Sequence, residues 1–270
     1  MTFIEAIILG IIQGATEFLP ISSSGHLILV PSIFNLDEPN LNAIAIAHQG
    51  TLLAVLIYFR HDLWSILKSV LAGLRSRTPL ANTESRLGWY IAVGSIPAVL
   101  VGLFLADAID RVLAKPVPVA AALIVTGVIL IVGERLVTGK KRLPQMGWAD
   151  ALIIGVAQAM ALIPGISRSG ITITAGLGRG LDRETAARYS FLLGVPAIAG
   201  AGLIAAAELA QSPTVSEQAP ELFVTFLAAA IVGYACIHFL LTWLREHTLY
   251  LFAAYCIGFG GLYLILNALG

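Results

Sequence analysis

Long apolar stretches separated by short polar loops dominate the hydropathy pattern of this chain. A transmembrane helix needs roughly 17–25 mostly apolar residues, and six stretches meet this length. Their glycines and alanines suit close packing of helices in lipid. The pattern therefore predicts an all-α polytopic membrane protein with six transmembrane helices. The six stretches are Asn42–Phe59, Leu87–Ala106, Val117–Leu136, Ala186–Ala207, Leu222–Leu244 and Thr248–Leu269.

Two further apolar segments, 2–34 and 149–181, are interrupted by polar and helix-breaking residues. The first is broken by Pro20 and three serines, and the second by Pro164-Gly165 and a Ser-Arg-Ser-Gly run. Non-helical backbone is tolerated at membrane depth only where it is buried in protein or lines a wet cavity. Each segment is therefore predicted to form a re-entrant helix-turn-helix hairpin that enters and leaves the membrane by the same face.

A signal peptide is the alternative interpretation of the first segment. A signal peptide has a positively charged region before its apolar core. This N-terminus has none, carries Glu5, and continues its apolar run into the polar break. The hairpin is therefore the better interpretation.

The two broken segments resemble each other in sequence at a fixed offset of 145 residues. Segments 6–27 and 151–172 share eight identical residues without a gap, where about two would match by chance, and this indicates a duplication. Three predicted spans lie between the copies, so the second copy is expected to be inverted in the membrane. The prediction is a single membrane domain of residues 1–270, with repeat 1 at about 1–136 and repeat 2 at about 149–270. The identical pairs are Ala6/Ala151, Ile8/Ile153, Gly10/Gly155, Gln13/Gln158, Ile21/Ile166, Ser22/Ser167, Ser24/Ser169 and Gly25/Gly170.

The composition excludes several classes of soluble protein. Of the 270 residues, 58% are hydrophobic and only 12% are charged, with a net charge of +0. A soluble domain carries about 25% charged residues. A soluble enzyme, a disordered protein and a nucleic-acid binder with a basic face are therefore excluded. The two cysteines lie in apolar stretches and exclude a disulfide framework or a Cys-rich metal site.

The few charges predict the orientation in the membrane. Lysines and arginines gather in the loops 60–86 and 137–148, whereas the loop 107–116 has two and the loop 208–221 has none. By the positive-inside rule the first two loops are cytoplasmic. Both termini are then expected on the outer side of the membrane. The loop 60–86 is expected to carry an amphipathic helix over Leu63–Leu74.

The first hairpin concentrates polar and ionisable groups in an apolar segment. Gln13 and Glu17 are four residues apart and share one face of a helix. Three hydroxyls and an imidazole follow, from Ser22, Ser23, Ser24 and His26. Ionisable residues inside a membrane are costly and are functional candidates by default. The alternative is that Glu17 caps a neighbouring helix and the serines satisfy the broken backbone.

The second hairpin places Arg168 at the start of its second helix, among hydroxyls and glycines. Exposed N–H groups at a helix N-terminus together with a guanidinium favour an anion. Arginine matches phosphate oxygens with two parallel hydrogen bonds. The alternative is that Arg168 merely pairs with Glu17 or another buried carboxylate.

If the two turns meet, the carboxylate, hydroxyls and imidazole of the first hairpin share one pocket with the guanidinium of the second. This combination of groups is suited to phosphoryl transfer. Arginine would stabilise the phosphate oxygens, a carboxylate can hold a divalent cation, and serine or histidine would attack or move a proton. His48 and His238 lie within predicted spans, and each is expected to make an interhelical hydrogen bond. A contact of His48 with the pocket is the alternative. The pocket residues would be Glu17, Ser23, His26, Ser167, Arg168 and Thr172.

The paired motifs at 13–26 and 164–172 resemble the signatures of the bacterial undecaprenyl-diphosphate phosphatase family, also called bacitracin-resistance proteins. The resemblance covers the whole chain, because length and hydropathy layout also match. It implies hydrolysis of undecaprenyl diphosphate to undecaprenyl phosphate and phosphate at the outer face of the bacterial plasma (inner) membrane. That reaction recycles the lipid carrier for peptidoglycan and other wall polymers.

The resemblance also implies roles for individual residues. Glu17 matches the essential acidic residue with a metal-linked role, and Arg168 matches the phosphate-binding arginine. Ser23 and His26 match the positions argued over as nucleophile and as acid/base. Many members have Glu where this chain has Gln13, which puts a two-carboxylate metal site in doubt. Glu17 would then hold Mg²⁺ or Ca²⁺ with phosphate oxygens and water, with Gln13 as a second possible ligand. The hydroxyls expected to bind phosphate with Arg168 are those of Ser22, Ser24, Ser167, Ser169 and Thr172.

Three alternatives stay open at this point. Inverted repeats with broken helices are also typical of secondary transporters, so a carrier or flippase of a lipid phosphate or small anion is the competing function. Either Ser23 or His26 can be the nucleophile. A homodimer is compatible with the sequence, which does not decide the oligomeric state.

Overall fold

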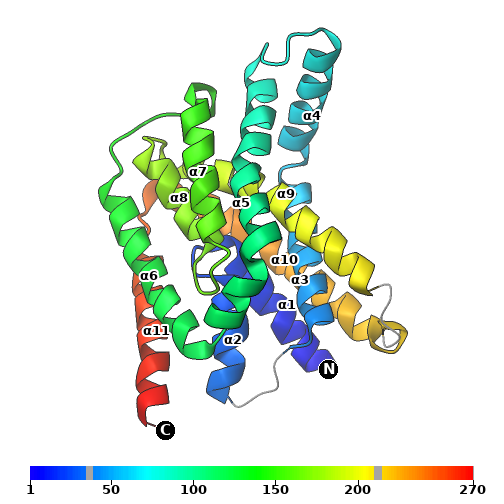
Figure 1. Ribbon diagram of the computed structural model, residues 1–270, viewed down its shortest axis with the longest axis vertical. Helices are drawn as coiled ribbons and strands as arrows, with labels where there is room; N and C mark the ends of the chain where they lie inside the picture. Colours follow the sequence, from blue (N-terminus) through cyan, green and yellow to red (C-terminus); the bar gives the residue numbers. More distant parts are fainter. Residues whose placement is uncertain (35–38, 210–214, 270) are drawn as a thin grey trace.

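The computed structural model describes residues 1–34, 39–209 and 215–269, and these residues form an all-helical protein (Figure 1). No strand occurs among them, only an isolated bridge between Lys141 and Leu181. This confirms the predicted all-α class. The helices are α1 (Phe3–Phe18), α2 (Ser23–Phe34), α3 (Leu41–Tyr58), α4 (Arg60–Arg75), α5 (Thr83–Leu113), α6 (Pro116–Arg135), α7 (Trp148–Met160), α8 (Arg168–Gly178), α9 (Arg183–Leu209), α10 (Val215–Glu246) and α11 (Tyr250–Leu269), with a short 3-10 turn η1 at Leu143–Gln145.

Six of the helices are long and apolar enough to cross a membrane. They are α3, α5, α6, α9, α10 and α11, the number expected from hydropathy. Several of them extend beyond the apolar stretches, and the largest extensions are those of α5, which continues to Leu113, and α10, which begins at Val215. Hydropathy marks only the apolar part of a helix, so the loops predicted at 107–116 and 208–221 are longer than the structure allows. The second of these loops lies partly outside the described residues.

The amphipathic helix expected over Leu63–Leu74 is present as α4. It packs against the start of α5, where an added side-chain carbon at Gly88 would lie 2.6 Å from a methyl of Val70. In Figure 1 this helical pair forms one end of the molecule, and both chain termini lie toward the opposite end. The most basic of the four loops is therefore at the end away from the termini.

Two short hairpins, α1–α2 and α7–α8, approach each other from opposite ends of the molecule (Figure 1). The helix α1 ends at Phe18, before Pro20, and α2 begins at Ser23. In the second hairpin the chain leaves α7 after Met160 and re-enters a helix at Arg168. The Pro and Gly residues in these breaks cannot continue a helix comfortably, so each segment turns back on itself. The two turns meet in the interior.

Glycines at equivalent positions of the two hairpins allow helix backbones to approach closely. A side-chain carbon added at Gly10 would lie 2.6 Å from Cβ of Ala228, so α1 lies directly on α10. At Gly155, 145 positions later, the added carbon would collide with the backbone of Gly94, so α7 lies directly on α5. Small residues at such crossings are typical of helix packing in lipid.

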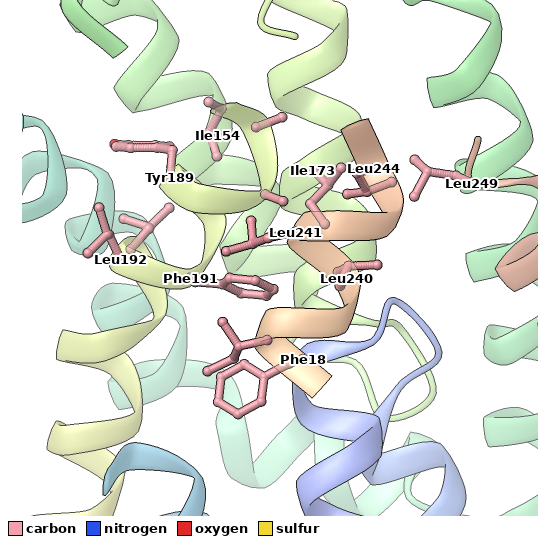
Figure 2. Packing of buried hydrophobic residues seen from close by; sticks show 14 of the residues in the cluster. Phe18, Ile154, Ile173, Tyr189, Phe191, Leu192, Leu240, Leu241, Leu244 and Leu249 are labelled. Carbon is pink, nitrogen blue, oxygen red and sulfur yellow. The ribbon is translucent and has the colours of Figure 1, made fainter. Parts of the chain in front are cut away.

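A buried apolar cluster supports the end of α1. Phe18 is fully buried and meets Phe191 of α9 edge to face, with ring centroids 5.5 Å apart. Both rings belong to one buried cluster with Leu240 and Leu241 of α10, and Figure 2 labels all four residues. Edge-to-face pairs of this kind add to the gain from apolar burial. The cluster therefore fixes the position of Glu17, which precedes Phe18 in the chain.

Candidate active site at the meeting of the two hairpins

Glu17 and Arg168 form an ion pair between the two hairpins. Glu17 lies in the last turn of α1, and Arg168 is the first residue of α8. The Nη2 of Arg168 donates to Oε1 of Glu17 over 2.8 Å, and the two side chains are only 15% and 8% exposed. The two turns therefore meet, as the shared-pocket hypothesis requires. The pairing considered as an alternative role for Arg168 is also present.

The second oxygen of the Glu17 carboxylate accepts hydrogen bonds from the first hairpin. The Ser23 hydroxyl donates to Oε2 over 2.8 Å, and Nε2 of Gln13 donates over 3.1 Å. A carboxylate that accepts from a serine hydroxyl is placed to receive its proton. Glu17 thus links the candidate nucleophile to the candidate anion-binding residue.

Ser22 and Ser167 cap the second helix of each hairpin. Oγ of Ser22 accepts from the backbone N–H of Gly25 over 3.2 Å, and Oγ of Ser167 accepts from Gly170 over 3.1 Å. Serine is a favoured capping residue because its hydroxyl satisfies an N–H that has no partner in the helix. The two turns therefore use the same capping contact at positions 145 residues apart.

Ser24 and Ser169 tie the two turns to each other. Oγ of Ser24 accepts from the backbone N–H of Gly165 over 3.2 Å, and Oγ of Ser169 donates to the carbonyl of Leu19 over 3.2 Å. Each serine thus binds the turn of the opposite hairpin. These contacts satisfy the interrupted backbone, which is the role that sequence analysis kept as an alternative for the serines.

Ser23 and Arg168 occupy equivalent positions of the two turns, 145 residues apart. Both donate to Glu17, one to each carboxylate oxygen. The equivalent positions therefore carry different chemistry, with a hydroxyl in the first turn and a guanidinium in the second.

His26 is held away from the carboxylate by two hydrogen bonds. Its Nδ1 lies 2.7 Å from the carbonyl oxygen of Ser22, and its Nε2 lies 2.7 Å from the hydroxyl of Tyr255 on α11. The ring also stacks on Phe259, with centroids 5.0 Å apart. Both ring nitrogens are therefore engaged with groups other than Ser23 and Glu17.

Two residues of α9 complete the surroundings of Arg168, and sequence analysis did not identify them. Nη1 of Arg168 donates to the carbonyl of Ser190 over 3.2 Å, and the Ser190 hydroxyl lies 2.6 Å from that of Thr172. A side-chain carbon at Gly194 would collide with the guanidinium. Ser190 and Gly194 are four residues apart and share one helix face. A serine and a glycine at this spacing in an apolar span were the available signal.

Thr126 of α6 was also not identified from the sequence. Its hydroxyl donates to the carbonyl of Gly165 over 3.0 Å and accepts from the N–H of Ser167 over 3.1 Å. It therefore holds the backbone on both sides of Ile166. Its only sequence signal was a hydroxyl in the middle of an apolar span.

The two membrane histidines differ in their outcomes. His238 of α10 lies 3.3 Å from the hydroxyl of Tyr58 on α3, which confirms an interhelical hydrogen bond. The prediction for His48 was wrong, because its Nδ1 bonds the carbonyl of Ile44 in its own helix over 2.9 Å. Its Nε2 lies 3.9 Å from Oε2 of Glu17, which is the pocket contact that sequence analysis kept as an alternative.

The side-chain oxygen atoms of Glu17 and Gln13 are suitable ligands for a hard divalent cation. Oε1 of Gln13 is buried without a hydrogen-bond partner, next to the carboxylate that its amide nitrogen binds. Among the described residues, no group of three or more His, Cys, Asp or Glu could hold a metal ion. Mg²⁺ is commonly held by one or two protein oxygens together with phosphates and water. Gln13 and Glu17 therefore fit a hard cation that takes most of its ligands from outside the protein.

The chain is similar to known proteins over nearly its whole length. The family model described as Bacitracin resistance protein BacA matches residues 6–262. The undecaprenyl-diphosphatase of Chlorobaculum tepidum is 48% identical over 263 residues, covering 94% of this chain and 93% of the relative. The enzyme of that name from Thermomicrobium roseum is 47% identical over 264 residues, covering 95% of each chain. The undecaprenyl-diphosphatase of Pelodictyon phaeoclathratiforme is 44% identical over 281 residues, covering 100% of this chain and 99% of the relative. The chain therefore belongs to the BacA family of bacitracin resistance proteins.

Proposed function

We propose that this protein is an undecaprenyl-diphosphate phosphatase, which hydrolyses undecaprenyl diphosphate to undecaprenyl phosphate and inorganic phosphate. The observation that carries the proposal is the junction at Glu17, where Ser23 and Arg168 donate to the two oxygens of one carboxylate. Family membership and the names of the relatives support the same activity. The product is the lipid carrier needed for bacterial cell-wall synthesis.

Arg168 is the residue that binds the terminal phosphate. Its guanidinium already holds an anion, the Glu17 carboxylate, over 2.8 Å. A phosphate that takes this place gains charge-assisted hydrogen bonds and leaves the carboxylate free. As negative charge shifts among the phosphate oxygens during transfer, the fixed guanidinium stabilises the transition state.

Ser23 is the nucleophile that the geometry supports. Its oxygen attacks the terminal phosphorus while its proton passes to Oε2 of Glu17, 2.8 Å away. The bond between the terminal phosphorus and the bridging oxygen breaks, and undecaprenyl phosphate leaves with the proton that Glu17 received. Water then attacks the phosphoserine and gives a proton to the free carboxylate of Glu17. Glu17 passes that proton to the serine oxygen as the bond between phosphorus and serine breaks, which restores the hydroxyl and releases phosphate. His26 is not assigned this role because both its ring nitrogens are engaged elsewhere.

Glu17 and Gln13 are the residues that would hold a divalent cation, Mg²⁺ or Ca²⁺. Such a cation would neutralise negative charge on the diphosphate. The carboxylate supplies charge, and the unpartnered amide oxygen of Gln13 supplies a second hard ligand. The chain itself therefore provides few ligands, which suits a cation that arrives with its phosphate substrate.

We place the two hairpins in the membrane as re-entrant elements of an inverted-topology repeat. The opposed approach of α1–α2 and α7–α8 supports this placement, as do the matching capping contacts of Ser22 and Ser167. The basic end at α4 would lie on the cytoplasmic side of the bacterial inner membrane. Both termini and the opening of the first hairpin then face outside. Labelling of single cysteines near residues 2 and 76 with an impermeant reagent in intact cells tests the orientation.

Phosphate release from undecaprenyl or farnesyl diphosphate in detergent tests the activity, with and without EDTA. Ser23→Ala is expected to abolish release. Rapid quenching of the wild-type enzyme should trap a phospho-enzyme that survives acid, since phosphoserine is acid-stable and phosphohistidine is acid-labile. An acid-labile adduct would instead identify His26 as the nucleophile, and a wild-type protein without phosphatase activity would refute the proposed function.

Transport remains the competing function, because paired broken helices are typical of secondary transporters. Movement of a lipid phosphate across liposomes by the Ser23→Ala protein would favour this function. The ion pair between Glu17 and Arg168 is compatible with either role. The serine hydroxyl on the carboxylate favours hydrolysis.

A further inference from the structure

Tyr255 contacts His26 although 229 positions separate the two residues in the chain. The Tyr255 hydroxyl lies 2.7 Å from Nε2 of His26. Tyr255 belongs to α11, outside both hairpins, and the residue is 43% exposed. Neither hairpin motif includes this tyrosine, so its role is inferred from its hydrogen bond with His26.

The chemistry of the contact fixes the direction of both hydrogen bonds of His26. The Ser22 carbonyl can only accept, so Nδ1 of His26 carries a proton and donates to it over 2.7 Å. In the neutral ring Nε2 is then an acceptor, and the Tyr255 hydroxyl donates to it. The ring is nearly parallel to the rings of Tyr255 and Phe259, with interplanar angles of 6° and 10°. Tyr255 therefore holds the imidazole in one orientation and one tautomer.

The imidazole in turn holds an unusual backbone. Ser22 has a φ of 70°, in the left-handed region that a residue with a side chain seldom occupies. Its carbonyl accepts from both the N–H and the Nδ1 of His26, over 3.3 and 2.7 Å. The next residue is Ser23, whose hydroxyl lies on Glu17. The direction in which the chain leaves Ser22 therefore decides where the Ser23 hydroxyl points.

The second hairpin provides an internal comparison. Ser167, the equivalent of Ser22, has an ordinary φ of −74°. Ile171 stands where the first hairpin has His26, 145 positions earlier. The imidazole is thus present only in the turn that has the left-handed serine and the candidate nucleophile.

We propose that Tyr255 is a positioning residue that acts through His26 and the Ser22 carbonyl to hold the Ser23 hydroxyl on Glu17. His26 is likewise a positioning residue rather than a proton carrier. This inference rests on the proposed phosphatase function. It adds to that function a residue on α11 and a chain of contacts that leads from α11 to the nucleophile.

Tyr255→Phe tests the proposal, because it removes the hydroxyl and keeps the stacked ring. Loss of one hydrogen bond of this kind should lower kcat for phosphate release by about five- to tenfold with little change in KM. Tyr263→Phe is the matched control. The Tyr263 hydroxyl also ties α11 to α2, at Ser32 over 2.9 Å, so its loss weakens the same helix pair away from His26. This control should stay within about twofold of the wild-type kcat.

Two variants of His26 separate positioning from acid–base chemistry. His26→Asn keeps a donor near the place of Nδ1 but cannot carry a proton, whereas His26→Ala keeps neither function. We expect His26→Asn to retain at least tenfold more activity than His26→Ala, and Tyr255→Phe to cost nothing further in the His26→Asn background. Equal loss in the two His26 variants, or a wild-type kcat for Tyr255→Phe, would overturn the inference and leave the phosphatase function standing. Absence of phosphate release by the wild-type protein would overturn the phosphatase function, and this inference with it.

Discussion

The guanidinium of Arg168 is bound to the carboxylate of Glu17 over 2.8 Å, with both side chains largely buried. A buried ion pair is weak evidence for stability, because desolvation of the two charges offsets much of their attraction. Here the pair lies where two interrupted helices meet and shares Glu17 with the Ser23 hydroxyl. In the proposed mechanism, the carboxylate therefore occupies the position that the phosphate takes on Arg168.

Arg168→Ala is expected to lower kcat/KM for phosphate release by about 10²–10³-fold, as loss of an oxyanion donor does in other enzymes. Arg168→Lys should also be strongly impaired, because an ammonium group cannot form two parallel hydrogen bonds. Steady-state kinetics in detergent measures both effects. Arg142→Ala is the control, because Arg142 is an exposed arginine paired with Asp182. Wild-type kinetics for Arg168→Ala would show that the phosphate binds elsewhere.

Gly194→Ala should move Arg168 without removing it. The added methyl would collide with the end of the guanidinium, and that flexible side chain must shift away from the site. Activity should fall by about tenfold or more, because misplacement by about 1 Å is costly in catalysis, while thermal stability changes little. Gly200→Ala lies on the same helix with open space around it and should behave as wild type. Full activity of Gly194→Ala would mean that the observed position of Arg168 is not the working one.

Gln13→Glu tests the cation hypothesis. If Gln13 and Glu17 hold the cation together, a second carboxylate should lower the Mg²⁺ concentration needed for half-maximal activity, since affinity rises with ligand charge. Gln13→Met, which has no amide oxygen, should raise that concentration. EDTA should abolish the wild-type activity, and added Mg²⁺ should restore it. A Mg²⁺ requirement that is the same in all three proteins would exclude Gln13 as a ligand.

The sequence was informative wherever one local signal decided the structure. Uninterrupted apolar length predicted the six membrane helices, and breaks at Pro20 and Pro164-Gly165 predicted the two hairpins. Glu17 and Arg168 were identifiable because a charged residue in an apolar segment is energetically costly and is therefore a functional candidate. Each of these signals is contained within about twenty residues.

The rest of the site depends on contacts between distant helices, which a local pattern does not contain. Tyr255 looks like any aromatic residue in an apolar helix until α11 brings it to His26. Ser190 and Gly194 matter only because α9 passes beside Arg168. The prediction for His48 was wrong for the opposite reason, because a carbonyl one turn earlier in its own helix satisfies Nδ1 and no distant helix is needed.

Gly155→Ala should destabilise the protein through the crossing of α7 and α5. The added methyl would collide with the backbone of Gly94, and a backbone cannot give way as a side chain can. Replacing glycine by alanine in a helix otherwise gains up to about 1 kcal/mol. The steric cost of separating two packed helices, about 1–3 kcal/mol, exceeds this gain. The midpoint of thermal unfolding in detergent should therefore fall.

Gly102→Ala is the matched control for this crossing. It lies on α5 with no neighbouring atom within 4 Å of the added carbon, so only the gain in helix propensity applies there. Its unfolding midpoint should stay the same or rise. Because α7 leads into the turn that carries Arg168, Gly155→Ala should also lower phosphatase activity at temperatures where it remains folded. If Gly155→Ala were as stable and as active as Gly102→Ala, the close approach of α7 and α5 would not be needed to place the second hairpin.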